Sequence, residues 1–546
     1  MNIVSLMDLN IKKAIKKQIK NPQDLSTILI KDRHGKAVIR HIVFSKVIFT
    51  FLLIALQIAF FILFLLRFKS SLEIYFGISL AITGLFMVYL SNTQGKNEFK
   101  IAWMLPLLVF PLFGVAAYLL YHLNRGGYKL SRRLADLKKR TEACLPSEAR
   151  AEELLKNFPE VEGIGRYLLK RGKFFPHTNT TVKYFKSGEE FYPDLLESVK
   201  AASKFIFIEF FIIEVDETWA ELLKVLEQKV KEGVEVRLLY DGLGSPIASQ
   251  GFYKKYLRSK GIRTHVFTPL IPFFSTEQNN RDHRKIVIVD GEVAYTGGVN
   301  ISNEYMNYGS KNRFEYWKDN AIRIEGPAIQ NFMMMFLQTW GVRTKTDDDY
   351  DRYINFPFPQ KQQAAGLIIP YGDDAFNKED IAEDVYLYII SNAKKYVYIT
   401  SPYMIIDNQM QEALIFAAHR GVNVTVMVPS VPDHFFTFCI GKTFLKTLCD
   451  EGVNVYTYEK GFIHEKTFIC DDKVATVGSV NLDYRSLFYH FECGAFMYDM
   501  PVISDIKADF ESSLGDCQKM NDEKYKKIPS YKRVIGRVLR LFAPLI

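Results

Sequence analysis

The chain has few cysteines for its length, and they form no recognisable pair. Six cysteines occur among 546 residues without a CxxC spacing. This excludes the usual sequence patterns of a zinc site and of a disulfide framework. We therefore expect six reduced thiols. Five of them follow residue 400, which favours a reducing, cytoplasmic environment for that part of the chain.

Acidic residues are scarce at both ends of the sequence. Residues 1–46 hold ten Lys and Arg against three Asp, and residues 524–546 hold seven against none. Because the whole chain carries a net charge of +9, the long middle part is net negative. This argues against a catalytic region that binds nucleic acid. Basic ends beside apolar segments instead favour contact with an anionic membrane surface.

A cleavable signal sequence is also absent from the N-terminus, because no short apolar core follows a short basic stretch. In residues 1–40, Ile11, Ile15 and Ile19 recur at helical spacing among lysines. This pattern predicts a basic amphipathic helix on the membrane, and a solvated basic tail is the alternative.

Three long apolar runs come next, at Val47–Leu66, Ile74–Leu90 and Ile101–Leu120. Each approaches the roughly 20 residues that a spanning helix needs. Residues 41–124 are therefore predicted to hold two or three transmembrane helices in a multi-pass protein of the cell membrane. Basic clusters flank both ends of this region, and basic flanks favour the cytoplasmic side of a membrane. Three full spans would place the two clusters on opposite sides. One run could instead be re-entrant or interfacial, and the side of the catalytic part stays open.

The rest of the chain is predicted to be an α/β fold made of two similar half-domains. Residues 125–175 have the composition of a helical connector. A strand–helix–strand order then occurs at Lys204–Ile213, Glu217–Lys231 and Val234–Tyr240. It returns at Tyr396–Ser401, Asn408–Arg420 and Val422–Val428. We therefore expect tandem repeats at residues 176–345 and 366–546, joined near 343–365.

A motif with the spacing H-x-K-x4-D-x6-G-[GS]-x-N occurs once in each repeat, 181 residues apart. The first copy consists of His283, Lys285, Asp290, Gly298 and Asn300. The second consists of His464, Lys466, Asp471, Ser479 and Asn481. Each copy is predicted to form a β-hairpin, in which the histidine and lysine share one face because side chains alternate along a strand.

This pair of motifs suits the chemistry of phosphate diesters. Two lysines and two asparagine amides can stabilise charge on phosphate oxygens. Two histidines can supply a nucleophile and a proton donor. Carboxylates on the following strands, Asp319 and Glu492, are candidates to hold each histidine in one tautomer. A metal site is the competing interpretation, but a lysine beside each histidine disfavours it, so we expect no metal.

The motifs resemble the signature of the phospholipase D superfamily, and more closely that of bacterial cardiolipin synthases. The resemblance runs over roughly residues 72–546. It includes Asn279-x-Arg281-x-His283-Arg284-Lys285, Trp317 with Asp319, and Asn481-Leu482-Asp483-Tyr484-Arg485. It departs at His490-Phe491-Glu492, where the family usually has Asn-x-Glu, and at Met404-Ile405-Ile406 after Tyr403.

The resemblance implies two tandem phospholipase D-like half-domains that form one active site, preceded by transmembrane α-helices. It also implies a cofactor-free cardiolipin synthase that joins two phosphatidylglycerol molecules through a phosphatidyl-histidine. By analogy His283 is the nucleophile and His464 the acid/base, although the sequence itself does not choose between them. The lysines, Asn300, Asn481, Gly298 and Ser479 would bind phosphate. Asp290 and Asp471 belong to the catalytic motif but are expected to hold the hairpin turn.

The same residues would also serve a phospholipase D hydrolase, or transfer to another alcohol. A nuclease and an inactive membrane scaffold are weaker alternatives, since the middle of the chain is net negative and no catalytic position of the motif is lost. The expected partners are phosphatidylglycerol, anionic membrane lipid and the membrane, without nucleic acid. The oligomeric state is left open.

Overall fold

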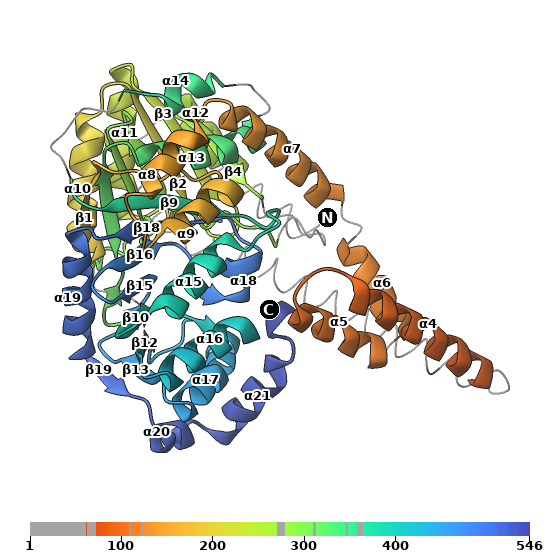
Figure 1. Ribbon diagram of the computed structural model, residues 1–546. Coiled ribbons are helices and arrows are strands. Elements are labelled where there is room, and N and C mark those ends of the chain that lie inside the picture. The colour runs from red at the N-terminus through yellow and green to blue at the C-terminus, as the bar shows by residue number, and fades with distance from the viewer. Residues whose placement is uncertain are drawn as a thin grey trace.

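The computed structural model describes residues 72–109, 111–122, 125–269, 279–309, 313–344, 348–357 and 364–545, together with Ile62. The predicted basic segment 1–40 and the first apolar run, apart from Ile62, lie outside these residues. Figure 1 shows two α/β units stacked on each other, with the N-terminal helices extending to one side.

The first unit is built on a seven-stranded sheet with the order β1-β8-β6-β5-β2-β3-β4. Its strands are β1 (Thr181–Phe185), β2 (Phe205–Phe210), β3 (Glu235–Asp241), β4 (Arg263–Phe267), β5 (Ile286–Val289), β6 (Val293–Gly297) and β8 (Ala321–Glu325). Its helices are α10 (Gly188–Ala201), α11 (Glu217–Lys231) and α12 (Gly251–Ser259). β2, β3 and β4 run parallel. The crossover from β2 to β3 contains α11 and that from β3 to β4 contains α12, as expected for connections between parallel strands.

The second unit is built on an eight-stranded sheet with the order β19-β13-β12-β10-β15-β16-β18-β9. Its strands are β9 (Leu367–Asp373), β10 (Tyr396–Thr400), β12 (Asn423–Pro429), β13 (Asn454–Tyr458), β15 (Thr467–Cys470), β16 (Val474–Gly478), β18 (Glu492–Tyr498) and β19 (Cys517–Lys519). Its helices are α15 (Ile381–Asn392), α16 (Asn408–His419), α17 (Phe435–Asp450), α18 (Tyr484–Phe488), α19 (Val502–Leu514), α20 (Asp522–Lys527) and α21 (Ser530–Arg540), followed by a 3₁₀ turn at Ala543–Leu545.

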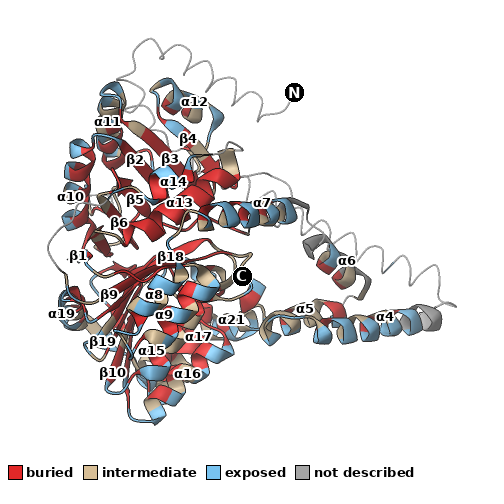
Figure 2. Cartoon of the chain, turned by 45° about the horizontal axis from the view of Figure 1, so that its top comes forward, coloured by how far each residue is buried: buried red, intermediate tan, exposed pale blue. Residues whose placement is uncertain are grey.

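Apart from β19, the two sheets have the same strand order, which confirms that whole α/β units are repeated. The helix α13 (Ile329–Thr344) lies between them and is buried on almost every side. It contacts β4 and β5 of the first sheet and β9 of the second. An apolar helix buried all round forms a common core for both units, and Figure 2 shows it as a red element between the sheets. The short α14 (Tyr350–Ile354) follows in the join.

Two of the short backbone pairings that connect the units lie beside the motif histidines. The strand β7 (Trp317–Lys318) of the first unit pairs in parallel with β14 (Phe462–Ile463) of the second. Asp282 of the first unit forms a bridge with Phe491 of the second. A third short pair lies within the second unit, between β11 (Met404–Ile405) and β17 (Leu482–Asp483). The two connecting pairings adjoin His464 and His283, so they bring both histidines to the interface between the units.

The N-terminal helices are α4 (Leu72–Asn92), α5 (Asn97–Val109) and α6 (Pro111–His122). The apolar run Ile101–Leu120, expected to span the membrane or to be re-entrant, is divided between α5, which ends at Val109, and α6, which begins at Pro111, a residue suited to the first turn of a helix. Within the described ranges, no helix has both the length and the apolar character needed to cross a membrane. The predicted transmembrane helices are therefore not found there.

The N-terminal helices are attached to the second unit. Lys96, between α4 and α5, forms ion pairs with Asp407, at 2.6 Å, and with Glu383. The ring of Phe99 packs edge-on against Tyr484 and Phe488 of α18. The predicted helical connector then follows as α7 (Arg125–Glu142), α8 (Glu148–Leu155), α9 (Glu162–Tyr167) and a π turn at Leu168–Gly172.

Candidate active site

Each motif begins a β-hairpin, as predicted. β5 pairs with β6 and β15 pairs with β16, both antiparallel. Asp290 and Asp471 occupy the turns with positive φ values of 54° and 52°. The Asp290 carboxylate accepts from the Phe205 backbone N–H at 2.8 Å, and Asp471 accepts from that of Tyr396 at 2.9 Å. Both aspartates thus attach the hairpin turn to the neighbouring strand. They lie at the far end of β5 and β15 from the histidines, which agrees with the predicted role in the turn.

The two motif histidines are held by carboxylates of the opposite unit. His283 Nδ1 lies 2.9 Å from Glu492 Oε1, and His464 Nδ1 lies 2.6 Å from Asp319 Oδ2. The main chain crosses in the same way. The His283 N–H donates to the Phe491 carbonyl at 2.9 Å, and the His464 N–H donates to the Lys318 carbonyl at 2.7 Å. Neither half-site can therefore form from one unit alone.

These contacts fix the tautomer of each histidine. A carboxylate that accepts from Nδ1–H leaves the lone pair of Nε2 free for attack or for accepting a proton. Lys466 Nζ also lies 2.8 Å from His464 Nδ1, but it donates to the His464 carbonyl oxygen. We therefore assign the Nδ1 proton to the bond with the negatively charged Asp319. Lys285 Nζ likewise donates to the His283 carbonyl, at 2.6 Å.

The site concentrates positive charge in a buried volume. Burial, followed by the charge of Lys285, lowers the pKa of His283 well below its ordinary range. Burial and Lys466 lower the pKa of His464 to about 4, although Asp319 opposes the shift. Burial also lowers the pKa of Lys285 to about 8 and that of Lys466 to about 7. A bound phosphodiester would supply the anion that these groups lack.

The motif glycine and serine support the carboxylates differently. A Cβ atom added at Gly298 would lie 2.0 Å from Asp319 Oδ1, so only glycine fits there. At the equivalent position, the Ser479 hydroxyl donates to Glu492 Oε2. Both residues were predicted to bind substrate. The structure places them against the carboxylates that orient the histidines.

The two motif asparagines also differ. Asn300 Oδ1 accepts from the Ile212 N–H at 3.0 Å, and its Nδ2 is buried without a partner. Asn481 Nδ2 donates to Ser486 Oγ at 3.1 Å, and its Oδ1 is the unpartnered atom. Asn300 therefore has an amide N–H available for a phosphate oxygen, whereas the amide N–H of Asn481 is already engaged.

The residue between histidine and lysine in each motif contacts the other unit. The Arg284 guanidinium donates through Nε to the Glu492 carbonyl at 3.0 Å. Glu465 pairs with Lys318 at 3.0 Å, and Lys318 pairs with Asp509 at 2.8 Å. Arg284 thus holds the strand of Glu492, and Glu465 holds the residue next to Asp319. Sequence reasoning did not assign these contacts, since neither side chain belongs to the reacting set.

Two aromatic rings beside the histidines were also missed as site residues. His490 lies two residues before Glu492, and Trp317 lies two residues before Asp319. Each packs against the histidine that this carboxylate orients. Burial lowers the pKa of His490 to about 3, so its ring is neutral at physiological pH. Both rings lie two residues before the carboxylate, and this equal spacing could have been recognised in the sequence.

The described residues include one group of side chains that could hold a metal ion. His283, His490 and Glu492 each offer one ligand atom, and these atoms lie within 4.8 Å of one another. Lys285 is next to this group, and its ammonium would oppose a metal cation. The absence of a metal from the reaction stays a prediction.

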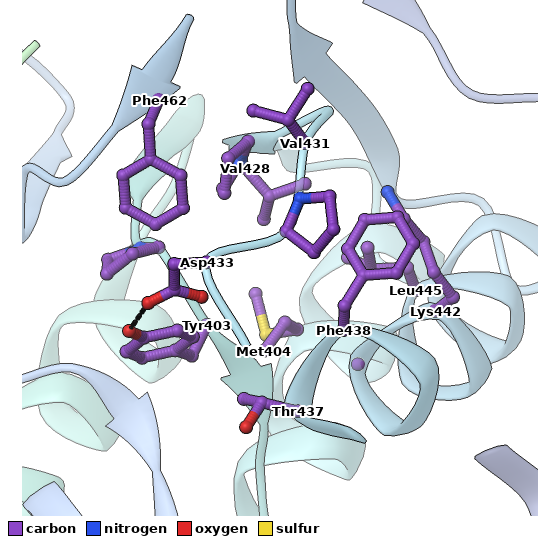
Figure 3. Close-up of a pocket in the computed structure, with 14 residues that line it drawn as sticks. Tyr403, Met404, Val428, Val431, Asp433, Thr437, Phe438, Lys442, Leu445 and Phe462 are labelled. Atoms are coloured by element: carbon purple, nitrogen blue, oxygen red, sulfur yellow. Dashed lines mark hydrogen bonds between the residues drawn. The ribbon is translucent and has the colours of Figure 1, made fainter. Parts of the chain in front are cut away.

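An apolar pocket lies near the His464 half-site. It has a volume of about 30 Å³ and is lined in part by Tyr403, Val428, Phe438 and Phe462. The Phe462 ring centroid lies 6.1 Å from that of His464. Figure 3 shows Tyr403 bonded to Asp433 on one side and the side chains of α17 on the other.

Comparisons with known proteins agree with this geometry. A family model described as the PLD-like domain of cardiolipin synthase matches residues 195–340 and 386–514. A model described as the phospholipase D-nuclease N-terminal region matches residues 79–121. An uncharacterised protein of Streptococcus mutans serotype c is 40% identical over 464 residues, which cover 84% of this chain and 99% of the relative.

A cardiolipin synthase of Staphylococcus aureus is 33% identical over 460 residues, which cover 82% of this chain and 91% of the relative. Among solved structures, phosphatidylserine synthase from Haemophilus influenzae superposes with a TM-score of 0.54 at 15% identity. That match covers 71% of this chain and 98% of the other, and it supports the fold.

The two repeated units and their crossed histidine–carboxylate pairs define a protein of the phospholipase D superfamily. Within that superfamily, the chain belongs to the bacterial cardiolipin synthase family, whose model matches both units and whose members match most of the length.

Proposed function

We propose that this protein is a cardiolipin synthase that transfers a phosphatidyl group between two phosphatidylglycerol molecules. The carrying observation is the pair of histidines from different units, each with Nδ1 on a carboxylate. Such a pair provides a nucleophile on one side of a phosphorus atom and a proton carrier on the other.

In the first step, His283 Nε2 attacks the phosphorus of phosphatidylglycerol. The bond from phosphorus to the headgroup oxygen breaks, and His464, which has taken up a proton at Nε2 once the anionic substrate is bound, gives that proton to the oxygen, so that glycerol leaves. His283 is the better candidate for the nucleophile, because its pKa is lowered well below the ordinary range and the neutral form is secured. Asp319 partly offsets the fall in the pKa of His464 to about 4, which suits an acid/base.

In the second step, the headgroup hydroxyl of another phosphatidylglycerol attacks the phosphatidyl-histidine. His464 takes the hydroxyl proton, the phosphorus–nitrogen bond breaks, and cardiolipin leaves with His283 restored. Lys285, Lys466 and the amide of Asn300 stabilise the negative charge on the phosphate oxygens. Asp319 and Glu492 orient the histidines, and Asp290 and Asp471 anchor the hairpins. No cofactor enters either step.

The fold supports a protein that works at a membrane. α21 and the residue that follows it expose an apolar stripe of Val534, Val538 and Leu541, each more than half exposed, while Gly536 on the opposite face packs against Cys439. An ordinary surface helix turns its apolar side inward. Here three apolar side chains stay exposed, with Arg537 nearby, which suits insertion into an anionic lipid surface.

The N-terminal helices add a second apolar surface. Ile78, Leu80, Leu85 and Val88 of α4 are each more than half exposed. The C-terminal 3₁₀ turn lies against α5, so the C-terminal end of the chain adjoins the N-terminal helices, as Figure 1 shows. We include in the proposal that residues 41–124 insert into the cell membrane as a multi-pass region. The repeats at 176–345 and 366–546 would then face the cytoplasm.

The alternative within the same chemistry is a phospholipase D hydrolase, or transfer to another alcohol. A product assay separates these possibilities. Purified protein in detergent, with a chelator present, should convert phosphatidylglycerol to cardiolipin and glycerol. If it formed only phosphatidic acid, the synthase proposal would fail and the hydrolase would stand. Loss of activity with the chelator would contradict the metal-free mechanism.

Membrane contact has a separate test. Full-length protein with Val534→Gln and Val538→Gln should float less with vesicles that contain phosphatidylglycerol than the unaltered protein does. Tyr308→Ser removes a side chain of similar exposure from the first unit and serves as the control. Equal flotation of all three proteins would remove α21 from the docking surface.

A further inference from the structure

Trp317 and His490 occupy equivalent positions in the two half-sites. Each lies two residues before the carboxylate that orients a catalytic histidine. The Trp317 ring centroid lies 5.3 Å from that of His464, with 45° between the ring planes. The His490 ring centroid lies 5.7 Å from that of His283, with 44° between the planes. The two rings therefore cover the two catalytic imidazoles in the same manner.

Both rings carry a buried nitrogen without a hydrogen-bond partner. These atoms are Trp317 Nε1 and His490 Nδ1. The indole nitrogen is always a donor. For His490, the nearest hydrogen-bonding group to Nε2 is Arg485 Nε, at 3.4 Å. Because Arg485 can only donate, Nε2 of His490 is the acceptor and its proton lies on Nδ1. Each ring therefore presents one unused N–H donor.

The neighbouring carboxylate does not satisfy the His490 donor. His490 Nδ1 lies 3.8 Å from Glu492 Oε1, which is beyond hydrogen-bond range. Glu492 already accepts from His283 and from the Ser479 hydroxyl. The Trp317 backbone is held by Asn307 through bonds of 2.8 and 2.9 Å, but the indole N–H takes no part in them. Packing alone would favour phenylalanine at both positions, because a buried donor without a partner lowers stability.

We propose that Trp317 and His490 are substrate-binding residues that donate their N–H groups to oxygen atoms of the glycerophosphate headgroup. Trp317 serves the side of His464, where the glycerol oxygen leaves and the acceptor hydroxyl arrives. His490 serves the side of His283, where the phosphoryl group becomes attached. This inference rests on the proposed function, which supplies the headgroup between the two histidines.

The test removes each donor and keeps a ring. Trp317→Phe and His490→Phe should each lower kcat/KM for phosphatidylglycerol about tenfold or more, the worth of a hydrogen bond to a charged group. Their Tm should stay the same or rise, because each substitution removes a buried donor that has no partner in the substrate-free protein. His490→Gln keeps a donor at this position and should retain more activity than His490→Phe.

Trp219→Phe provides the matched control. Trp219 is buried and lies outside both motifs in the sequence. Its Nε1 donates to the Tyr253 hydroxyl at 2.6 Å. The same substitution there should lower Tm and leave kcat/KM unchanged, which is the opposite pattern. The inference is overturned if Trp317→Phe and His490→Phe keep activity within about twofold, or if both lose Tm together with activity.

Identification of the lipid product that the unaltered enzyme forms tests the proposed function separately. If that enzyme releases phosphatidic acid in place of cardiolipin, the synthase proposal fails. The ratios between variants still decide whether these two rings bind the phosphatidyl headgroup, since they can be measured on either product.

Discussion

The His283 and His464 half-sites share one geometry and differ in almost every supporting residue. His464 is oriented by Asp319, which fits against Gly298 with no space for a side chain. His283 is oriented by Glu492, which receives a hydroxyl bond from Ser479. Asp319 is thus held by close packing and by the Asn320 backbone N–H, at 2.9 Å, whereas Glu492 is held by a side-chain hydroxyl.

The comparison shows that the two units place their imidazoles in the same way but use different side chains to hold them. It also shows where the halves are free to specialise. The ring beside His464 is an indole, which cannot accept a proton, and the ring beside His283 is a second imidazole. We infer that the His464 side handles proton transfer to alcohols and the His283 side carries the phosphatidyl group.

The largest expected effect is the loss of either catalytic histidine. His283→Ala and His464→Ala should each lower cardiolipin formation at least about ten-thousandfold, because nucleophile and proton carrier act as one unit. Thin-layer separation of labelled lipid products measures this. Substantial activity in either variant would show that one half-site suffices.

Replacement of the orienting carboxylates should cost less. Asp319→Asn and Glu492→Gln should each lower kcat about a hundred- to a thousandfold, since the imidazole then loses its fixed tautomer. With a phosphatidyl ester whose leaving group needs no proton, the Asp319→Asn defect should shrink and the Glu492→Gln defect should persist. Equal behaviour of both variants toward that ester would contradict the division of roles.

The glycine–serine difference predicts unequal effects of the same new side chain. Gly298→Ala should lower kcat about tenfold or more, because its Cβ meets Asp319 Oδ1. Ser479→Ala removes one hydrogen bond from Glu492 and should cost about two- to tenfold. Initial rates of both purified variants provide the comparison. A larger loss in Ser479→Ala would reverse the steric argument.

The smallest expected effect is a pH dependence from the lysines. The charged ammonium exists below its pKa, which is about 7 for Lys466 and about 8 for Lys285. Phosphate binding should therefore weaken as pH rises through this range, and KM should increase about fivefold between about pH 6.5 and about pH 9. Lys466→Met should remove the earlier part of the rise. A KM that falls with pH would contradict the assignment.

Much of this arrangement followed from the sequence. Equal spacing of the two motifs and the repeated strand–helix–strand order were local patterns, and the hairpins β5–β6 and β15–β16 form as predicted. Asp319 and Glu492 were found because the sequence places both in or beside the next predicted strands. The expected turn role of Asp290 and Asp471 agrees with their contacts.

The contacts between the two units could not be predicted in the same way. Nothing local to Glu492 indicates that it orients His283, because the pairing depends on how the two units stack. The contacts of Arg284 and Glu465 with the opposite unit arise for the same reason. The division of the Ile101–Leu120 run between two helices was also not predicted, because apolar composition does not show that Pro111 starts a new helix.

Trapping of the covalent intermediate tests the central claim most directly. His464→Ala should be incubated with the phosphatidyl ester that needs no proton for departure, digested at alkaline pH and analysed by mass spectrometry. We predict a phosphatidyl group on the peptide that contains His283, and none when His283→Ala is treated in the same way. A phosphatidyl group on His464 in His283→Ala, with none on His283 in His464→Ala, would contradict the account.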